Sequence, residues 1–265
     1  MIIDVFSLFN SQKMELEITE TILLVLAGVA AGFINTVAGG GSLLTLPLLI
    51  FFGLPPVIAN GSNRIAILLQ NILGVAGFKS KGVFVFPFSL WVGLSALAGA
   101  LIGAKIGVSL SGETFNRILA IVMLAVVLIM IFNPIKTNSD TSYERTDTKH
   151  HVFSIIAFFF VGIYGGFIQA GVGFIMMASL TFINRFTLVK TNSIKVFVVF
   201  IYTWAALGVF IYEGKVNWPI GLILALGNMT GAWIGSRWSV AKGDVWIKRF
   251  MLVMVTVMAI KLWFY

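Results

Sequence analysis

The sequence predicts an all-α protein, built as a polytopic transmembrane helical bundle of about eight membrane segments. Its residues are 59% hydrophobic and 11% charged, whereas soluble domains carry roughly 25% charged residues. Two long stretches, residues 21–63 and 152–184, contain no Asp, Glu, Lys or Arg. A helix that crosses the hydrocarbon core needs about 20 apolar residues, so each stretch is longer than one span. The third observation is an internal repeat.

The repeat relates the two halves of the chain at a spacing of 132 residues. A proline, two glycines and an arginine recur in register. The matched positions are Pro87, Gly99, Gly103 and Arg117 with Pro219, Gly231, Gly235 and Arg249. A duplication of this kind divides the chain into residues 21–134 and 151–265, with an N-terminal extension of residues 1–20 and a polar linker of residues 135–150.

Each half is expected to contain an interrupted apolar segment followed by three further membrane segments. The interrupted segments are residues 21–52 and 151–183. The remaining segments are expected at residues 62–78, 84–104 and 114–133, and at residues 191–212, 218–236 and 245–263. Ser62 and Ser193 open the second segment of each half and resemble helix N-caps, because a serine oxygen can accept from a free amide of the first turn.

The Lys and Arg residues of short loops predict the orientation, because cytoplasmic loops carry an excess of them. The parts expected to be cytoplasmic are residues 184–195 and 237–249, together with Arg64 and residues 105–117; Lys79, Lys81 and residues 213–215 are then external. If each interrupted segment crosses once, both termini of this multi-pass cell-membrane protein lie outside. If each is a full span plus a re-entrant hairpin, its end lies within the membrane.

Charge and residue usage exclude several classes of protein. The formal charge of +8 is scattered at segment ends, which favours membrane anchoring over nucleic-acid binding, and no basic-aromatic surface module is present. Cysteine is absent, so thiolate metal sites and cysteine nucleophiles are excluded. No catalytic constellation appears. We expect no enzyme activity, no cofactor and no metal; the expected partners are the lipid bilayer and a small anion.

Glycine-rich breaks interrupt the first segment of each half. The candidate binding residues there are Asn35, Gly39, Gly40 and Gly41 in the first half, and Gln169, Gly171 and Gly173 in the second. Lipid cannot satisfy the backbone groups that such a break frees, so it must be buried or line a cavity. Interrupted segments at matching places in two halves point to a transporter's binding site. Close helix packing through small residues is the alternative explanation.

Polar clusters that end in a cation follow each break. They supply the remaining candidate anion-binding residues, which are Asn60, Ser62, Asn63 and Arg64 with the deeper Gln70 and Asn71, and Asn192, Ser193 and Lys195. Arg64 is suited to this role because a guanidinium can hold an oxyanion through two parallel hydrogen bonds. The alternatives are snorkelling of the cations to the headgroups and, for Gln70 and Asn71, hydrogen bonding between helices.

The chain resembles the TauE/SafE sulfite-exporter family, which is grouped with the toluenesulfonate uptake permeases. The resemblance rests on residues 31–42 (AGFINTVAGGGS), residues 59–64 (ANGSNR) and the duplicated half with its Gly-x-Gly break. It implies a polytopic inner-membrane permease for sulfite or organosulfonate anions, some members working outward and some inward. The second half departs from the first, because Gln169 replaces Asn35 and only Gly171 and Gly173 remain of the glycine string.

These observations predict a secondary transporter that moves sulfite or a related sulfur oxyanion or organosulfonate by alternating access. Export is expected, because a cytoplasm-negative membrane favours anion exit by about 2.3 kcal/mol per charge per 100 mV. No carboxylate lies in any expected span to carry a compensating proton. The alternatives are a coupled importer, a channel, and a membrane-embedded enzyme or assembly factor that shares the fold.

Overall fold

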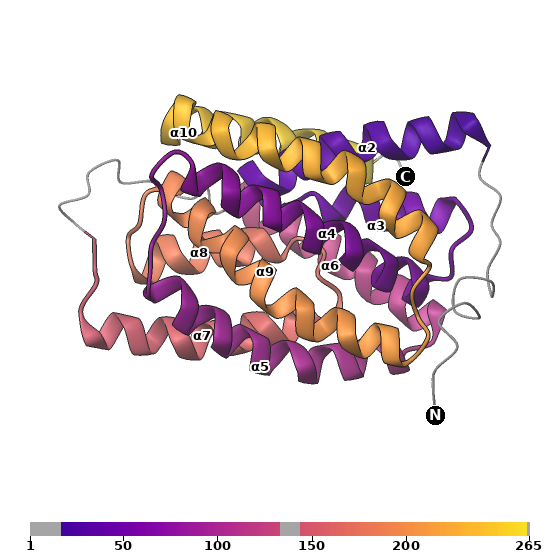
Figure 1. Ribbon diagram of the computed structural model, residues 1–265, viewed down its shortest axis with the longest axis horizontal. Coiled ribbons are helices and arrows are strands. Elements are labelled where there is room, and N and C mark those ends of the chain that lie inside the picture. The colour runs from indigo at the N-terminus through magenta and orange to yellow at the C-terminus, as the bar shows by residue number, and fades with distance from the viewer. Residues whose placement is uncertain (1–16, 133–143, 264–265) are drawn as a thin grey trace.

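A computed structural model describes residues 17–132 and 144–263, and within them all regular structure is helical (Figure 1). The helices are α2 (Ile18–Val37), α3 (Ser42–Phe51), α4 (Pro56–Lys79), α5 (Phe88–Ser109), α6 (Gly112–Phe132), α7 (Thr148–Phe167), α8 (Val172–Ile183), α9 (Leu188–Tyr212) and α10 (Trp218–Trp263). By length and composition, α2, α5, α7 and α9 can each cross a membrane. The all-helical prediction is therefore confirmed for the described residues, and these four helices support the membrane assignment. Most of the expected linker, and residues 1–16 of the extension, lie outside the described part.

Helix α4 begins earlier than the sequence predicted, at Pro56. A proline is well placed in the first turn, because its missing N–H would have no partner there. Ser62 therefore lies inside the helix, and its Oγ donates to the carbonyl oxygen of Ile58 at 2.8 Å. The Oγ of Ser62 also accepts from the backbone amide of Asn217 at 2.7 Å. The predicted N-cap at Ser62 is wrong, because Ser62 joins α4 to the loop before α10.

The predicted N-cap at Ser193 in the second half is also wrong. Helix α9 begins at Leu188, and the side chain of Thr187 caps it by accepting from the amide of Lys190 at 3.3 Å. Ser193 lies inside α9 and donates to the carbonyl oxygen of Val83 at 2.6 Å. Ser193 therefore fastens the start of α9 to the loop between α4 and α5.

Each interrupted segment forms a helical hairpin that returns to the end at which it began. Leu24, near the start of α2, packs in one cluster with Leu49 and Leu54, which lie at and beyond the end of α3. In the second half, Ser154 near the start of α7 donates to the side-chain oxygen of Asn184, which follows α8, at 2.7 Å. Neither hairpin runs from one end of the bundle to the other. Of the two alternatives left open by the sequence, the single crossing is therefore not the one that this arrangement supports.

Helices α4 and α9 run antiparallel through the centre of the bundle. The start of α4 meets the end of α9, because a Cβ on Gly61 would lie 2.0 Å from the carbonyl oxygen of Lys215. The start of α9 meets the end of α4 through the bond from Ser193 to Val83. We call the end of the bundle with the α4–α5 and α8–α9 loops the Lys81 end, and the end with the α3–α4 and α9–α10 loops the Lys215 end.

This antiparallel arrangement corrects the orientation that the sequence predicted for the first half. Arg64 and residues 105–117 were expected on the side of residues 184–195. The structure instead places residues 105–117 toward the Lys215 end, since Gly107 packs on Phe210 near the end of α9. Lys79 and Lys81, expected on the opposite side, share the Lys81 end with residues 184–195.

Two parallel helix pairs, α2 with α10 and α5 with α7, are packed through glycines. A Cβ on Gly103 would lie 1.9 Å from the carbonyl oxygen of Ile163, and one on Gly231 would lie 2.1 Å from that of Val29. Small residues let helix backbones approach in this way. Each pair takes one helix from each half of the chain, so the two halves are interlocked.

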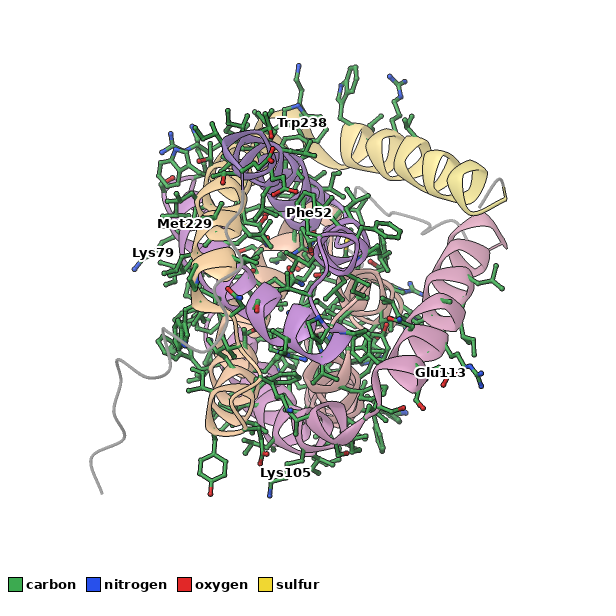
Figure 2. All side chains as sticks on the ribbon, turned by 90° about the vertical axis from the view of Figure 1, so that its right-hand side faces the viewer. Phe52, Lys79, Lys105, Glu113, Met229 and Trp238 are labelled. Carbon is green, nitrogen blue, oxygen red and sulfur yellow. The ribbon has the colours of Figure 1, made fainter. Side chains whose placement is uncertain are left out.

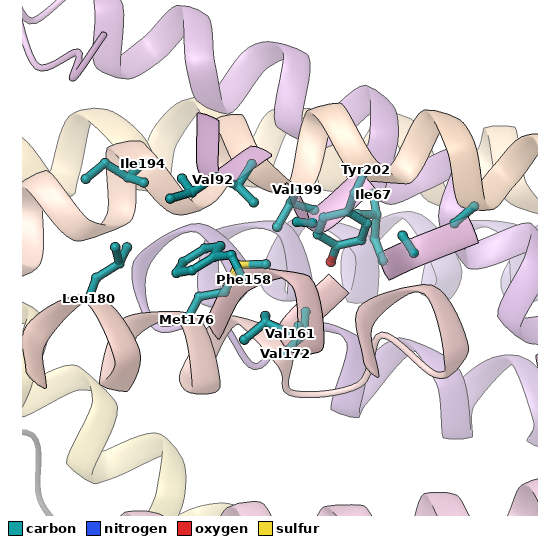
Figure 3. Close-up of a cluster of buried hydrophobic side chains, with 14 of the residues drawn as sticks. Ile67, Val92, Phe158, Val161, Val172, Met176, Leu180, Ile194, Val199 and Tyr202 are labelled. Atoms are coloured by element: carbon teal, nitrogen blue, oxygen red, sulfur yellow. The ribbon is translucent and has the colours of Figure 1, made fainter. Parts of the chain in front are cut away.

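Helix α10 is continuous from Trp218 to Trp263, although two segments were expected there. Figure 2 shows its C-terminal part standing away from the main bundle together with α6. Figure 3 shows the largest buried cluster, in which Ile67 of α4 and Val199 of α9 pack with Phe158 and Met176. This apolar cluster includes residues of α7 and α8 and fixes the second hairpin against α4, α5 and α9.

Candidate functional site: two helix breaks and their buried cations

The first helix break, residues 38–41, packs at the centre of the bundle against the first turn of α8, which directly follows the second break, residues 168–171. A Cβ on Gly39 would lie 2.5 Å from the backbone of Gly173, and one on Gly173 would lie 2.3 Å from that of Gly39. A Cβ on Gly40 would lie 2.6 Å from the ring of Phe174. Close packing therefore accounts for glycine at these positions, and the ring of Phe174 occupies the space beside Gly40.

The breaks also leave backbone donors without partners. In the described chain, the amides of Gly40, Gly41 and Ser42 donate to no protein acceptor, and neither do those of Gly171 and Gly173. These groups lie at the N-terminal ends of α3 and α8, where a helix carries a partial positive charge. Such ends bind anions readily.

Arg64 is fully buried and holds the C-terminal end of α7. Its Nη1 donates to the carbonyl oxygen of Gly165 at 3.1 Å and to Oε1 of Gln169 at 2.9 Å. Its Nη2 donates to the carbonyl oxygens of Gly166 at 2.6 Å and Phe167 at 3.3 Å. We call this set of contacts the Arg64 clasp. Burial rules out snorkelling, and the Nε of Arg64 is left as a buried donor without a described partner.

Lys195 holds the C-terminal end of α2 through similar hydrogen bonds. Its Nζ donates to the carbonyl oxygens of Asn35 at 2.9 Å and Thr36 at 3.0 Å, and to Oδ1 of Asn192 at 2.6 Å. The side chain is 2% exposed. We call this set the Lys195 clasp. Asn35 contributes its main-chain oxygen here.

Two asparagines complete the clasps in matching ways. Nδ2 of Asn60 donates to the carbonyl oxygen of Phe167 at 2.8 Å, and Nδ2 of Asn192 donates to that of Val37 at 2.8 Å. Both acceptors are the last residues of their helices, whose carbonyls lack partners within the helix. Asn60 and Asn192 therefore position the breaks, each from the opposite half of the chain.

In the part of the chain that the structure describes, no carboxylate balances the two cations. The acidic side chains that the structure describes lie outside the buried core; they are Glu17, Glu20, Glu113, Glu144, Asp147 and Glu213. The C-terminal ends of α2 and α7 each offset roughly half a charge, and the N-terminal ends of α3 and α8 add roughly the same amount back. About two positive charges therefore remain at the breaks.

The remaining predicted residues divide into two groups. Asn63 lies at the site: its Oδ1 accepts from Thr45 at 2.8 Å, and its buried Nδ2 has no described partner. Gln70 and Asn71 instead make hydrogen bonds between and within helices. Oε1 of Gln70 accepts from Asn228 of α10 at 3.2 Å, and Nδ2 of Asn71 donates to the carbonyl oxygen of Ile67 at 2.7 Å. For these two, hydrogen bonding within the protein is what the structure shows.

Two residues near this polar region were missed by the sequence analysis. Asn228 lies in α10 with its Oδ1 buried and without a described partner. Tyr202 of α9 is fully buried beside Gly165, and its hydroxyl also lacks a described partner (Figure 3). An asparagine alone in an apolar span was the available signal for Asn228. For Tyr202 the signal was its position in the second half, which roughly matches that of Gln70 and Asn71; the tyrosine itself gave none, because tyrosine in membrane helices is common at interfaces.

A cavity of about 270 Å³ lies elsewhere, at the Lys81 end. Its walls are mainly apolar and come from the start of α5, the start of α7 and the α8–α9 loop, with Pro87, Trp91 and Phe186 among them. Lys190 at this cavity is paired with Glu144 at 2.6 Å. The cavity is separate from the breaks.

Gln169 adopts a left-handed backbone conformation (φ 67°) that non-glycine residues avoid. Replacing Gln169 by glycine removes about 1–2 kcal/mol of strain but also a charged hydrogen bond worth about 1.5–3 kcal/mol. We expect the melting temperature to change little while the anion transport that the sequence predicts falls, because Arg64 loses an acceptor. Arg185→Gly is the control, since it relieves a similar conformation (φ 57°) in the α8–α9 loop and should leave transport unchanged. Equal transport by both variants would contradict a role for the Gln169 side chain.

Comparison with known proteins identifies a family and several relatives. A family model described as sulfite exporter TauE/SafE matches residues 24–262. Similar relatives include the probable membrane transporter protein ORF9 of a Sinorhizobium species (29% identical over 90% of each chain), a probable membrane transporter protein of Haemophilus influenzae (27%, covering 94% of this chain and 96% of the relative) and the probable membrane transporter protein YfcA of Escherichia coli K12 (28%, covering 96% and 93%).

No solved structure gives a significant match. The family and the names of the relatives indicate a membrane transporter and not an enzyme. By the family model, which spans nearly the whole described chain, the protein belongs to the sulfite exporter TauE/SafE family.

Proposed function

We propose that the protein is a secondary transporter for sulfite or a related small sulfur oxyanion or organosulfonate, bound where the two helix breaks meet. The observation that carries this proposal is the pair of buried cations, Arg64 and Lys195, in a core without a described carboxylate. Isolated charges in a medium of low dielectric are costly, so an anion at the breaks is strongly favoured. The unpartnered amides of Gly40, Gly41 and Ser42 supply donors for its oxygens.

The test of this function is a flux assay in liposomes. The purified protein is reconstituted and offered sulfite, sulfate, thiosulfate and small sulfonates one at a time. Saturable flux of at least one sulfur anion, blocked by an excess of the others, supports the proposal. Absence of flux for the whole panel would contradict it, and flux that does not saturate would indicate a channel.

The chain is, in this proposal, an inverted pair of four-segment repeats. Helices α2 to α6 would correspond to α7, α8, α9 and the two parts of α10, with the first segment of each repeat folded as a hairpin. The antiparallel α4 and α9, and the breaks that meet between them, support this assignment. Inverted repeats with broken helices at the midplane are the usual basis of alternating access.

The Lys81 end is assigned to the cytoplasm by its cations. Its described Lys and Arg residues are Lys79, Lys81, Arg145, Lys149, Arg185, Lys190 and Arg237, against Lys105, Arg117 and Lys215 at the other end. Since the chain has no cysteine, single cysteines can be introduced cleanly. We expect a membrane-impermeant thiol reagent to label Lys215→Cys from outside intact cells, and Lys81→Cys and Arg185→Cys only after lysis. Labelling of Lys81→Cys and Arg185→Cys from opposite sides would contradict the antiparallel arrangement.

The proposed direction is export. An inside-negative potential favours exit of a divalent anion by about 4.6 kcal/mol per 100 mV. We expect loss of thiosulfate or sulfite from loaded vesicles to accelerate when a potassium gradient with valinomycin makes the interior negative. Uptake that requires a sodium gradient, or efflux that ignores the potential, would favour coupled import instead.

A further inference from the structure

The two clasps hold equivalent helix ends with different cations. Arg64 and Lys195 each reach from the central helix of one half to the end of the first helix of the other half. A guanidinium stays charged under all conditions met by a protein, whereas a lysine can release its proton when its environment changes. One clasp is therefore permanently positive, and the other can titrate.

The Lys195 clasp is built for the protonated form. The three oxygen acceptors, on Asn35, Thr36 and Asn192, match the three N–H bonds of an ammonium group. A neutral amine has two N–H bonds and a lone pair, which would face an oxygen. The closed arrangement in this structure therefore stabilises Lys195 in its charged state.

Among the described residues that contact Lys195, none can take its proton in this state. From α2 it faces main-chain oxygens of Asn35 and Thr36, and from α8 it faces the sulfur of Met177 at 3.9 Å. The buried charge on α4 is Arg64, which is engaged by α7. On α10, the guanidinium of Arg237 lies over the ring of Trp233 at 3.8 Å. The tyrosine hydroxyl of α7, on Tyr164, donates to the carbonyl oxygen of Ala170.

A movement of the first break, residues 38–41, would change the hydrogen bonding that keeps Lys195 protonated. Two of the three acceptors belong to α2, so a shift of α2 against α9 that opens the break removes them from Nζ together. A buried ammonium without its hydrogen bonds is costly, and lysine escapes that cost by giving its proton to water. Arg64 cannot lose its charge in this way, because a guanidinium stays protonated.

We propose that Lys195 carries one proton with each anion, and this proposal rests on the transport function proposed above. The anion binds while Lys195 is protonated, and the loaded protein opens to the other side. The anion leaves, and the proton passes from Nζ to water on that side. The empty protein returns with a neutral Lys195, which takes a proton from the first side. A divalent anion then moves with a net charge of −1, so the membrane potential still favours its exit.

The first test measures coupling in the unaltered protein. Vesicles containing the protein are clamped at zero potential with equal potassium and valinomycin, and thiosulfate, sulfite and methanesulfonate are supplied equally on both sides. A pH difference of one unit should drive about a tenfold accumulation of the transported anion on the alkaline side. Anion exchange without accumulation would overturn the proton proposal and leave the transport function intact, whereas absence of all flux would contradict the transport function.

The second test assigns the proton to Lys195. A pH-sensitive dye reports proton movement per anion in the unaltered protein, in Lys195→Arg and in Arg64→Lys. We expect about one proton per anion, beyond any carried by the anion itself, in the unaltered protein. Arg64→Lys should carry at least one, because a lysine in the Arg64 clasp can release its proton as well. Lys195→Arg keeps the charge of the clasp and should lose both the coupled proton and the accumulation. Retention of coupling by Lys195→Arg would overturn the assignment; if that variant does not fold, accumulation by Lys195→Met at the level of the unaltered protein would overturn it equally.

Discussion

Replacing Arg64 by glutamine should lower anion affinity by about a hundredfold or more. Glutamine is shorter and has two N–H bonds, so it cannot hold Gly165, Gly166, Phe167 and Gln169 together as Arg64 does. A hydrogen bond made by a charged group is worth about 1.5–3 kcal/mol, and about 1.4 kcal/mol corresponds to a factor of ten in affinity. The loss of one positive charge weakens anion binding directly, and the freed end of α7 weakens it further.

Arg249→Gln is the matched control for this variant. Arg249 is exposed, and its guanidinium lies 5.3 Å from the ring of Trp246, a contact worth about 0.5–1 kcal/mol. The apparent affinity should change less than about threefold. Thermal melting of both variants shows whether the protein is folded. The apparent anion affinity of Arg64→Lys, which keeps the charge, should lie between those of the two glutamine variants. Similar affinities for Arg64→Gln and Arg249→Gln would mean that Arg64 only anchors the helix.

The helical class, the membrane assignment and the positions of the breaks were predictable from the sequence. Charge-free apolar stretches and glycine strings are local signals, and both hairpins turn where the glycines indicated. The predicted anion-binding role of the site residues stays a prediction. The structure adds that Asn60, Arg64, Asn192 and Lys195 gather at the breaks, each pair on the break of the opposite half.

The relative direction of the two halves was not predictable from the loops. The sequence aligned Arg64 with Lys195 and gave both the same side, but the two residues lie on antiparallel helices. Their asparagine partners show the correspondence better, because Asn60 and Asn192 are 132 residues apart and make the same bond to a helix end. The contacts across the breaks are equally non-local: nothing in the string of residues 38–41 indicates that Gly173 will lie against Gly39.

Replacing Gly173 by alanine should abolish transport while leaving a folded protein. The added Cβ would lie 2.3 Å from Cα of Gly39 and 2.6 Å from its carbonyl oxygen, so the two breaks must separate. Overpacking of this kind usually costs about 1–3 kcal/mol, which a large helical bundle can tolerate. A displacement of about 1 Å at a functional site can, however, cost about a hundredfold in rate.

Gly208→Ala is the matched control for Gly173→Ala. Gly208 lies in α9 with open space around it, and alanine is favoured over glycine inside a helix by about 0.5–1 kcal/mol. That variant should melt slightly higher and transport normally. Flux per folded molecule, measured in vesicles after quantification by gel filtration, separates loss of function from loss of protein. Normal flux in a folded Gly173→Ala protein would show that the anion does not pass where the breaks meet, because their contact could not survive the added methyl group unchanged.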